Sequence, residues 1–317
     1  MRSTPLYGEG ASRPVSAALG AAADTMSDIL KPDASAPSYS PSPRPTFDRP
    51  TAIPYRAVTR HIWGDPIAGE VADWIYASTG RIHCLVFGLA PGQGFRHSSE
   101  FRTIFRADEV LEVLSGTMVI ANPETGEVLR VPAGERVAFG PDTWHHAFAH
   151  GTEPLRVLEL YAPPPAAGTS GSYARTRPLL ESIRYTAVDS YPPTLRFVAS
   201  ADITWHRDLG ILTGTVARTD QLEVTALEVN PGEVSEKHTH HGDEVLYVKS
   251  GTLWVRVWDV ERSYTFELEP RDACFIPAGC AHEYRNIDTP QCVATLGVAP
   301  PNESNADDSD TGGDSPP

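Results

Sequence analysis

The chain contains one sequence unit twice, and this internal repeat restricts the possible folds more than any other feature. Residues 108–116 read DEVLEVLSG, and residues 243–251 read DEVLYVKSG. Upstream of each segment lies a Pro-Gly pair, at residues 91–92 and 231–232, and downstream both copies end in Ala-Pro-Pro. A long repeat of this kind indicates duplicated supersecondary units. We therefore expect two similar structural units in one chain.

Both copies are built from short apolar runs that have the character of β-strands. Apolar and polar residues alternate in these runs, and Pro-Gly, Asn-Pro and Asp-Thr-Pro signals separate them. Short strands at such spacing are typical of sandwiches and barrels. The sequence therefore predicts an all-β fold, with strands that include residues 82–87, 117–121, 136–139, 222–229, 253–258 and 273–276.

The second copy carries a group of residues that suits a metal ion. His238 and His240 are one residue apart, so on an extended segment both side chains point to the same face. Glu244 begins the next apolar run, and a turn between them returns it to the same interior. His282 follows the tight turn at residues 277–279 and supplies a fourth group. Three imidazoles and one carboxylate suit iron, manganese, nickel, copper or zinc.

These residues resemble the two motifs of the cupin superfamily. The spacing of the first motif is found in Gly232, His238, His240, Glu244 and Gly251. The spacing of the second is found in Pro277, Gly279, His282 and Asn286, although Arg271 stands where the family usually has a glycine. The resemblance covers about residues 55–300 and implies two tandem cupin barrels, of the double-stranded β-helix or jelly-roll kind, as in the bicupin branch. It implies one divalent transition metal ion per chain, with iron as the first choice, and its ligands are His238, His240, Glu244 and His282.

In the first copy the same positions are incomplete. His97 is present, but the paired second histidine is missing, and the spacing from His97 to Glu109 is longer than the corresponding spacing in the second copy. Gly140 and Asp142 replace the usual proline and glycine before His145. His97, Glu109 and His145 form a possible second, degenerate metal site. The alternative is that this barrel has lost its metal and serves packing, dimerisation or lid formation.

Composition divides the chain into folded and unfolded parts. A chain of 317 residues is long enough for two moderate cores, while the Pro/Ser-rich start and the acidic Pro/Ser/Gly-rich end cannot form a packed core. We expect a disordered segment at residues 1–48 and a first barrel at residues 49–163. A linker at residues 164–195 should lead to a second barrel at residues 196–300, followed by a disordered acidic tail at residues 301–317.

Two residues near the predicted metal ligands are candidates for substrate binding. Arg256 lies between Trp254 and Trp258 on one strand face, where a guanidinium can hold a carboxylate. The alternative is an outer face packed on the other barrel or on a partner chain. Tyr284 shares the parity of His282 and should line the cavity, whereas Tyr247 has the opposite parity to Glu244 and should face away.

The metal implied by the resemblance is compatible with three kinds of function. Our first expectation is a dioxygenase for a small oxygen-rich or aromatic substrate, with Glu244 as ligand or catalytic base. A non-redox isomerase, lyase or decarboxylase of a small acid or sugar is the second. A non-catalytic cupin that binds a small ligand is the third, because one scaffold hosts many functions.

Charge and composition set expectations for partners and location. The net charge of −15 argues against nucleic acid, which is bound through clustered Lys and Arg. No run approaches the ~20 apolar residues that cross a bilayer, and no secretory signal is recognisable. The four cysteines lack Cys-x-x-Cys spacing. We expect a cytoplasmic homodimer that acts on a small molecule, without nucleic acid or membrane partners.

Overall fold

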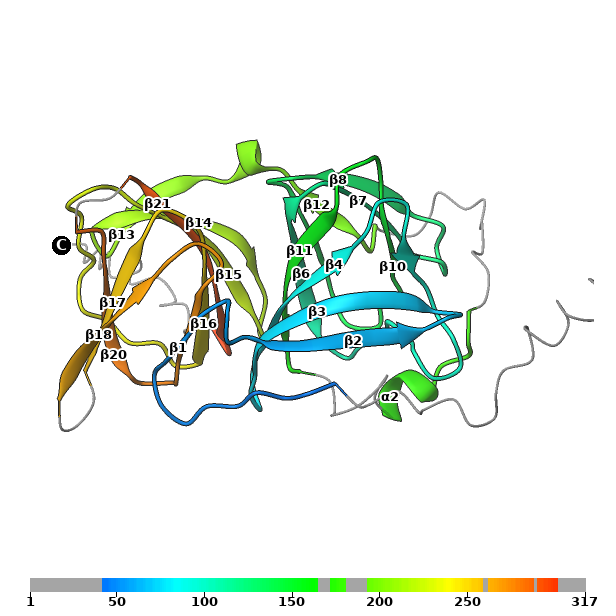
Figure 1. The fold of residues 1–317 in the computed structure, drawn as a ribbon, viewed down its shortest axis with the longest axis horizontal. Coiled ribbons are helices and arrows are strands. Elements are labelled where there is room, and N and C mark those ends of the chain that lie inside the picture. The colour runs from blue at the N-terminus through cyan, green and yellow to red at the C-terminus, as the bar shows by residue number, and fades with distance from the viewer. Residues whose placement is uncertain (1–41, 165–171, 181–192, 259–261, 288–289, 302–317) are drawn as a thin grey trace, which may run out of the picture. The chain divides into compact units, whose positions relative to one another are not determined.

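The computed structural model describes residues 42–164, 172–180, 193–258, 262–287 and 290–301. Within this part the chain forms two β-barrels in tandem (Figure 1). The predicted all-β fold with two barrels is therefore confirmed. None of the helices in the described ranges is long and apolar enough to cross a membrane.

The first barrel combines a seven-stranded and a four-stranded antiparallel sheet. The larger sheet has the order β12-β9-β6-β11-β4-β3-β2. Its strands are β2 (Thr59–Asp65), β3 (Gly69–Ser78), β4 (His83–Leu89), β6 (Asp108–Ser115), β9 (Arg136–Phe139), β11 (Leu155–Ala162) and β12 (Arg196–Val198). The smaller sheet has the order β5-β10-β7-β8, with β5 (Gly94–Phe95), β7 (Thr117–Ala121), β8 (Val128–Pro132) and β10 (His146–Ala149).

The second barrel repeats this plan with a seven-stranded and a three-stranded sheet. The larger sheet has the order β1-β19-β16-β21-β15-β14-β13. Its strands are β1 (Thr51–Ile53), β13 (Trp205–Asp208), β14 (Ile211–Arg218), β15 (Glu223–Val229), β16 (Asp243–Ser250), β19 (Ala273–Ile276) and β21 (Cys292–Ala299). The smaller sheet has β17 (Leu253–Trp258) between β18 (Ser263–Leu268) and β20 (Ala281–Arg285). The repeated segments form β6 and β16, which occupy equivalent places in the two sheets.

The outermost strands are exchanged between the barrels. β1 precedes the first barrel in sequence, yet it pairs with β19 of the second through the register Ala52↔Cys274. β12 precedes the second barrel and pairs with β9 of the first through Phe197↔Val137. The ranges 49–163 and 196–300 that we predicted for the barrels each begin with a strand that the other barrel uses. Sequence periodicity identifies a strand but not its partner.

Three apolar clusters hold this arrangement together. One fills the first barrel, and Leu111 of β6 and Ile120 of β7 belong to it. A second fills the second barrel, and Leu246 of β16 and Val255 of β17 belong to it. The third contains residues of both barrels, among them Tyr76 and Tyr247, whose rings lie 5.4 Å apart edge to face. Tyr247 thus faces away from its own barrel interior, as the strand alternation predicts.

Part of the segment predicted to be disordered is packed on the barrels. Phe47 contacts Phe275, with ring centroids 5.6 Å apart, and Arg44 donates to the Ser78 hydroxyl and the Thr79 carbonyl. Residues 42–48 therefore differ from the prediction, because an apolar ring and a hydrogen-bonding cation anchor an otherwise polar segment. The rest of that segment, and the acidic tail from residue 302, lie outside the described residues. The predicted linker contains a short helix, α2 (Ser172–Arg175), and a 3-10 turn, η2 (Ser200–Asp202), follows it in the chain.

Candidate metal centre

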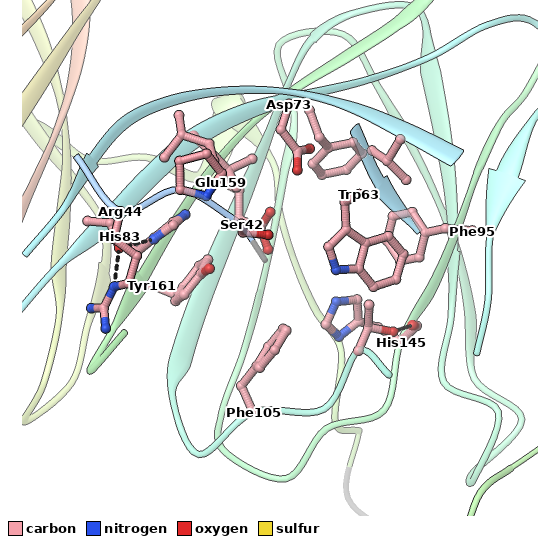
Figure 2. A pocket seen from close by; sticks show the side chains of 17 residues that line it. Ser42, Arg44, Trp63, Asp73, His83, Phe95, Phe105, His145, Glu159 and Tyr161 are labelled. Atoms are coloured by element: carbon pink, nitrogen blue, oxygen red, sulfur yellow. Dashed lines mark hydrogen bonds between the residues drawn. The ribbon is translucent and has the colours of Figure 1, made fainter. Parts of the chain in front are cut away.

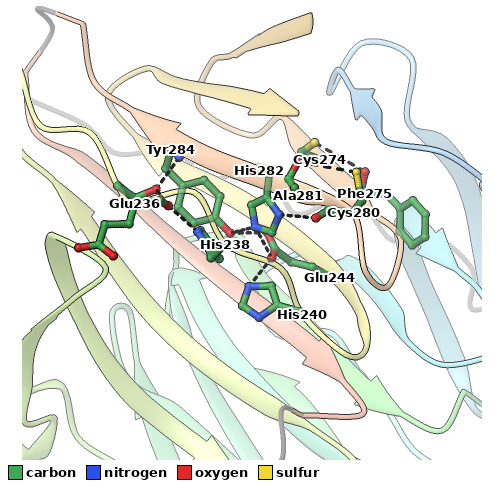
Figure 3. A network of polar contacts seen from close by, with 11 residues as sticks. Glu236, His238, His240, Glu244, Cys274, Phe275, Cys280, Ala281, His282 and Tyr284 are labelled. Atoms are coloured by element: carbon green, nitrogen blue, oxygen red, sulfur yellow. Dashed lines mark hydrogen bonds and ion pairs between the residues drawn. The ribbon is translucent and has the colours of Figure 1, made fainter. Parts of the chain in front are cut away.

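The four predicted ligands of the second barrel come from three segments that meet inside the barrel. Glu244 is the second residue of β16, and His282 is the second residue of β20. His238 and His240 lie in the connection between β15 and β16, and His238 pairs with His282 through two backbone hydrogen bonds of 3.0 and 2.9 Å. Figure 3 shows the three imidazoles converging on the Glu244 carboxylate.

The ligand atoms of these residues are close enough to share one ion. One ring nitrogen from each of the three histidines lies within 4.8 Å of the others. Oε2 of Glu244 lies 3.0 Å from Nε2 of His240 and 3.2 Å from Nε2 of His282. Ligand atoms around an ion with bonds of about 2.0–2.2 Å lie roughly 3 to 4 Å apart. The structure thus brings together all four residues that the sequence singled out.

Backbone carbonyls orient two of the imidazoles. Nδ1 of His238 lies 2.8 Å from the Glu236 carbonyl oxygen, and Nδ1 of His282 lies 3.0 Å from the Cys280 carbonyl oxygen. A carbonyl oxygen only accepts, so Nδ1 carries the proton in both rings, and the lone pair of the neutral ring lies on Nε2. This tautomer suits metal ligation through Nε2.

Burial and neighbouring charges set the ionisation of the site. Burial alone would raise the pKa of Glu244, but His282 and His240 lower that pKa well below its usual value. Burial and the nearby His282 lower the pKa of His238 to about 4, so this ring is neutral at neutral pH. Burial also acts to lower the pKa of His282, but the Glu244 carboxylate outweighs it and raises that pKa. Glu244 is therefore an anion and His238 a neutral ligand.

The Glu244 carboxylate provides the test of whether a cation fits here. Glu244 is fully buried, and its Oε1 accepts a hydrogen bond of 2.6 Å from the Tyr284 hydroxyl. Its Oε2 forms no hydrogen bond of acceptable geometry within the described part of the chain. A buried anionic oxygen that lacks a donor is costly. An ion between Oε2 and the imidazole nitrogens would satisfy it, so the residues fit a bound divalent metal.

Other motif residues shape the backbone around the ligands. Gly279 has φ = +74°, a conformation that favours glycine, and its N–H donates to the His240 carbonyl. The Asn286 side chain donates to the carbonyls of Val229 and Pro290, and the Asn286 carbonyl accepts from Gly232. These residues hold the connection that carries His238 and His240.

A cavity of about 170 Å³ opens beside the site. Tyr284 lines it, as predicted, together with His238 and His240. Arg256 does not, because its guanidinium lies over the Trp258 ring, 5.0 Å from the centroid, on the outer face of β17. Arg256 therefore lies on an outer face, and the alternative that this face packs on the other barrel or on a partner chain stays a prediction. The polar wall is formed by residues that the sequence reading did not select: His206, Asp208, Thr213, Thr215, Arg218, Glu223 and Thr225.

Of the three residues considered for a site in the first barrel, the structure keeps Glu109 and His145 together and separates His97 from them. Nε2 of His145 lies 3.9 Å from Oε2 of Glu109. His97 instead packs against His146 and Trp144, with ring centroids 4.3 and 4.4 Å away, and its Nδ1 accepts a hydrogen bond from the backbone of Thr103. His97 therefore does not belong to the group that contains Glu109 and His145. The long insertion after His97 supplies one of these partners, Thr103.

Comparisons with known proteins agree with this fold. The family model described as a cupin domain matches residues 226–296, which contain all four candidate ligands. No curated protein sequence matches the chain. The described fold is that of a two-barrel cupin, and the cupin domain model matches part of its second barrel.

Solved structures with the same two-barrel plan are distant in sequence. Oxalate decarboxylase from Lactobacillus farciminis is 13% identical with a TM-score of 0.57, and the match covers 83% of this chain and 90% of that chain. A putative glyoxylate-induced protein from Pseudomonas aeruginosa is 16% identical with a TM-score of 0.58, covering 83% and 94%. Protein Ylba from E. coli is 11% identical with a TM-score of 0.56, covering 79% and 90%. At these identities the similarity establishes the fold alone.

Proposed function

We propose that the second barrel is the active site of a metal-dependent enzyme that acts on a small carboxylic acid, as a decarboxylase or another lyase. The observation that carries the proposal is the buried Glu244 Oε2 beside three imidazoles, two of which line a cavity with polar residues on its wall. His238, His240, Glu244 and His282 would hold the ion. When bound, the ion supplies a Lewis acid that stabilises negative charge developing on the substrate.

The cavity wall supports a small acid as the substrate class. Arg218, at the end of β14, lines the cavity together with Thr213 and Thr225. A guanidinium binds a carboxylate through paired hydrogen bonds, and hydroxyls can orient its oxygen substituents. Arg218 itself donates to Glu223 at 2.9 Å, which fixes the guanidinium at the wall.

Two further residues have assigned roles in this proposal. Tyr284 positions Glu244 through its 2.6 Å hydrogen bond to Oε1. Glu244 would hold the ion, and as an ionised carboxylate it would also be the proton acceptor nearest to the substrate. Both side chains are buried, so bulk water does not compete for these contacts.

The dioxygenase that we expected first remains a prediction, with iron as its metal. The polar residues of the cavity wall suit an oxygen-rich acid better than an aromatic ring, and this holds for the dioxygenase as well as for the non-redox alternative. Oxalate decarboxylase acts on a small dicarboxylate, so the fold is compatible with such a substrate.

Metal content and substrate turnover test the proposal in turn. Protein purified without chelators should contain a transition metal in the second barrel, and His240→Ala should lose it. His241→Ala is the matched control, since this neighbouring histidine is exposed and lies outside the ligand group. Retention of the full metal content by His240→Ala would rule out the assigned ligands.

Turnover should be assayed with short-chain mono- and dicarboxylic acids, with and without oxygen, by release of carbon dioxide and by product analysis. Turnover that is equal in both conditions supports the lyase. Strict dependence on oxygen supports the dioxygenase and overturns the lyase. Arg218→Ala should raise KM for the acid, while Arg256→Ala, on the outer face, should not.

A further inference from the structure

A second group of possible metal ligands lies inside the first barrel, and its composition differs from the motif. One ligand atom each from Glu109, His145 and Glu159 lies within 4.8 Å of the others. Glu159 is not part of the sequence motif and lies on β11, the strand that follows His145 and β10 in the chain. His97 is absent from the group.

Strand register explains why Glu159 joins this group. Glu109 on β6 lies opposite Tyr161 on β11, and Glu159 is two residues before Tyr161. Residues opposite each other in an antiparallel pair share a face, and so do residues two apart. The two carboxyl groups are therefore diagonal neighbours that project into the same barrel interior.

This interior holds buried acids without basic partners. Glu109 is 2% exposed and Asp73 is 7% exposed, and neither forms an ion pair with a lysine or arginine in the part of the chain that the structure describes. Oε2 of Glu109 also has no hydrogen-bond partner there. Buried carboxylates need a cation or a proton. Burial, followed by the neighbouring Glu159, raises the pKa of Glu109 well above its usual value, and burial raises the pKa of Glu159 to about 7.

His145 presents a metal-binding nitrogen to these acids. Its Nδ1 lies 3.3 Å from the Thr143 carbonyl oxygen, so the proton resides on Nδ1 and the lone pair on Nε2. Nε2 lies 3.9 Å from Oε2 of Glu109. Burial lowers the pKa of His145 to about 3, so the ring is neutral at neutral pH. A neutral imidazole does not neutralise the carboxylates, but it does ligate a metal ion.

The group opens on a cavity of about 90 Å³ that gives an ion access and room for water ligands. Figure 2 shows Asp73, Glu159 and His145 around the same interior space, with Trp63 and Tyr161 among its walls. His83 also lines this cavity, and its Nε2 is buried and has no hydrogen-bond partner among the described residues. The interior therefore offers several polar atoms that the protein itself does not satisfy.

We propose that the first barrel binds a divalent transition metal ion between Glu109, Glu159 and His145. Two carboxylates and one imidazole neutralise the charge of a divalent ion and suit manganese, iron, cobalt or zinc better than calcium or magnesium. The alternative is that Glu109 and Glu159 share protons and the cavity holds only water.

The test counts metal ions in single and combined variants of the full chain. Stripped protein is titrated with Mn²⁺, and bound metal is measured after gel filtration, while Co²⁺ reports the ligand field by absorption. His240→Ala should retain one bound ion in the first barrel, and His240→Ala combined with Glu159→Gln should retain none.

Two further variants separate this site from its alternatives. His97→Ala should leave the ion bound, whereas loss of the ion would mean that the motif histidine is the ligand and would overturn the proposal. Glu100→Gln is the control for charge, because Glu100 is exposed. The proposal is wrong if the double variant His240→Ala/Glu159→Gln binds as much metal as His240→Ala. It is also wrong if His240→Ala binds no ion while its far-UV circular dichroism stays native.

Discussion

Glu112 joins the two barrels through a buried charged cluster, and its removal should destabilise the protein strongly. Its Oε1 accepts from Arg136 of the first barrel and from Lys249 of the second, both at 2.7 Å. Its Oε2 accepts from the Thr295 hydroxyl at 2.6 Å. The side chains of Glu112 and Arg136 are only 3% and 5% exposed. Glu112→Ala would leave two cations close together without the anion between them.

The expected loss follows from the burial of the partners. Removing one member of a buried ion pair costs about 3–5 kcal/mol, because the other charge stays desolvated. The Lys249 side chain keeps 19% of its exposure, so water partly solvates it and the value should lie near about 3 kcal/mol. For a folded part of this size, that loss lowers Tm by roughly 6–12 °C.

Urea denaturation of the full chain, followed by circular dichroism, measures this loss. Glu100→Ala is the control, since its ion pair with Arg175 spans 3.4 Å between side chains that are more than half exposed. Such a surface pair contributes about 0–1 kcal/mol. If Glu112→Ala and Glu100→Ala have the same free energy of unfolding, the cluster does not hold the barrels together and the argument is wrong.

Three more outcomes follow from the structure. Burial alone would raise the pKa of Glu112, but Lys249 and Arg136 lower this pKa below its usual value. The stability that Glu112 contributes is therefore complete above its unfolded-state pKa and is lost as the pH falls through its folded-state pKa. The difference in urea midpoint between the wild type and Glu112→Gln should accordingly become smaller in acid. Tyr284→Phe removes the donor to Glu244 and should weaken Mn²⁺ binding by about 10- to 100-fold in a metal titration. Gly251→Ala should destabilise more than Gly232→Ala in urea: both have positive φ, but an added Cβ at Gly251 would lie 2.6 Å from a backbone oxygen, whereas nothing lies within 4 Å at Gly232.

The internal repeat predicted two similar units, the resemblance to the cupin superfamily implied that both are barrels, and the histidine spacing selected four residues that the structure brings together. Strand alternation placed Tyr284 beside the cavity and Tyr247 on the opposite face, because side chains on a strand alternate. The repeat also contained information that we did not use. Its two copies differ at Glu112 and Tyr247 and at Leu114 and Lys249, and the structure places Glu112, Tyr247 and Lys249 in contacts between the barrels.

Other features depend on contacts that a linear sequence does not display. Glu159 reaches the first-barrel group only through the register of β11 against β6, and its position in an ordinary apolar run gave no signal. Arg218 lines the cavity because β14 ends there. Arg256 lies between two tryptophans in the sequence, which suggested substrate binding, but it lies on the outer face. The local sequence pattern predicts which side chains share a face of a strand. Which residues that face contacts depends on how the sheets pack together.

The exchange of β1 and β12 has a consequence for how this chain can be divided. A cut between β11 and β12 leaves the second half without β1 and the first half without β12, so the fragments expose the unpaired edges of β19 and β9. Such bare edges promote intermolecular pairing. The two barrels are therefore not independent modules. A fragment made for separate expression of one barrel must also include the strand that this barrel takes from the other part of the chain.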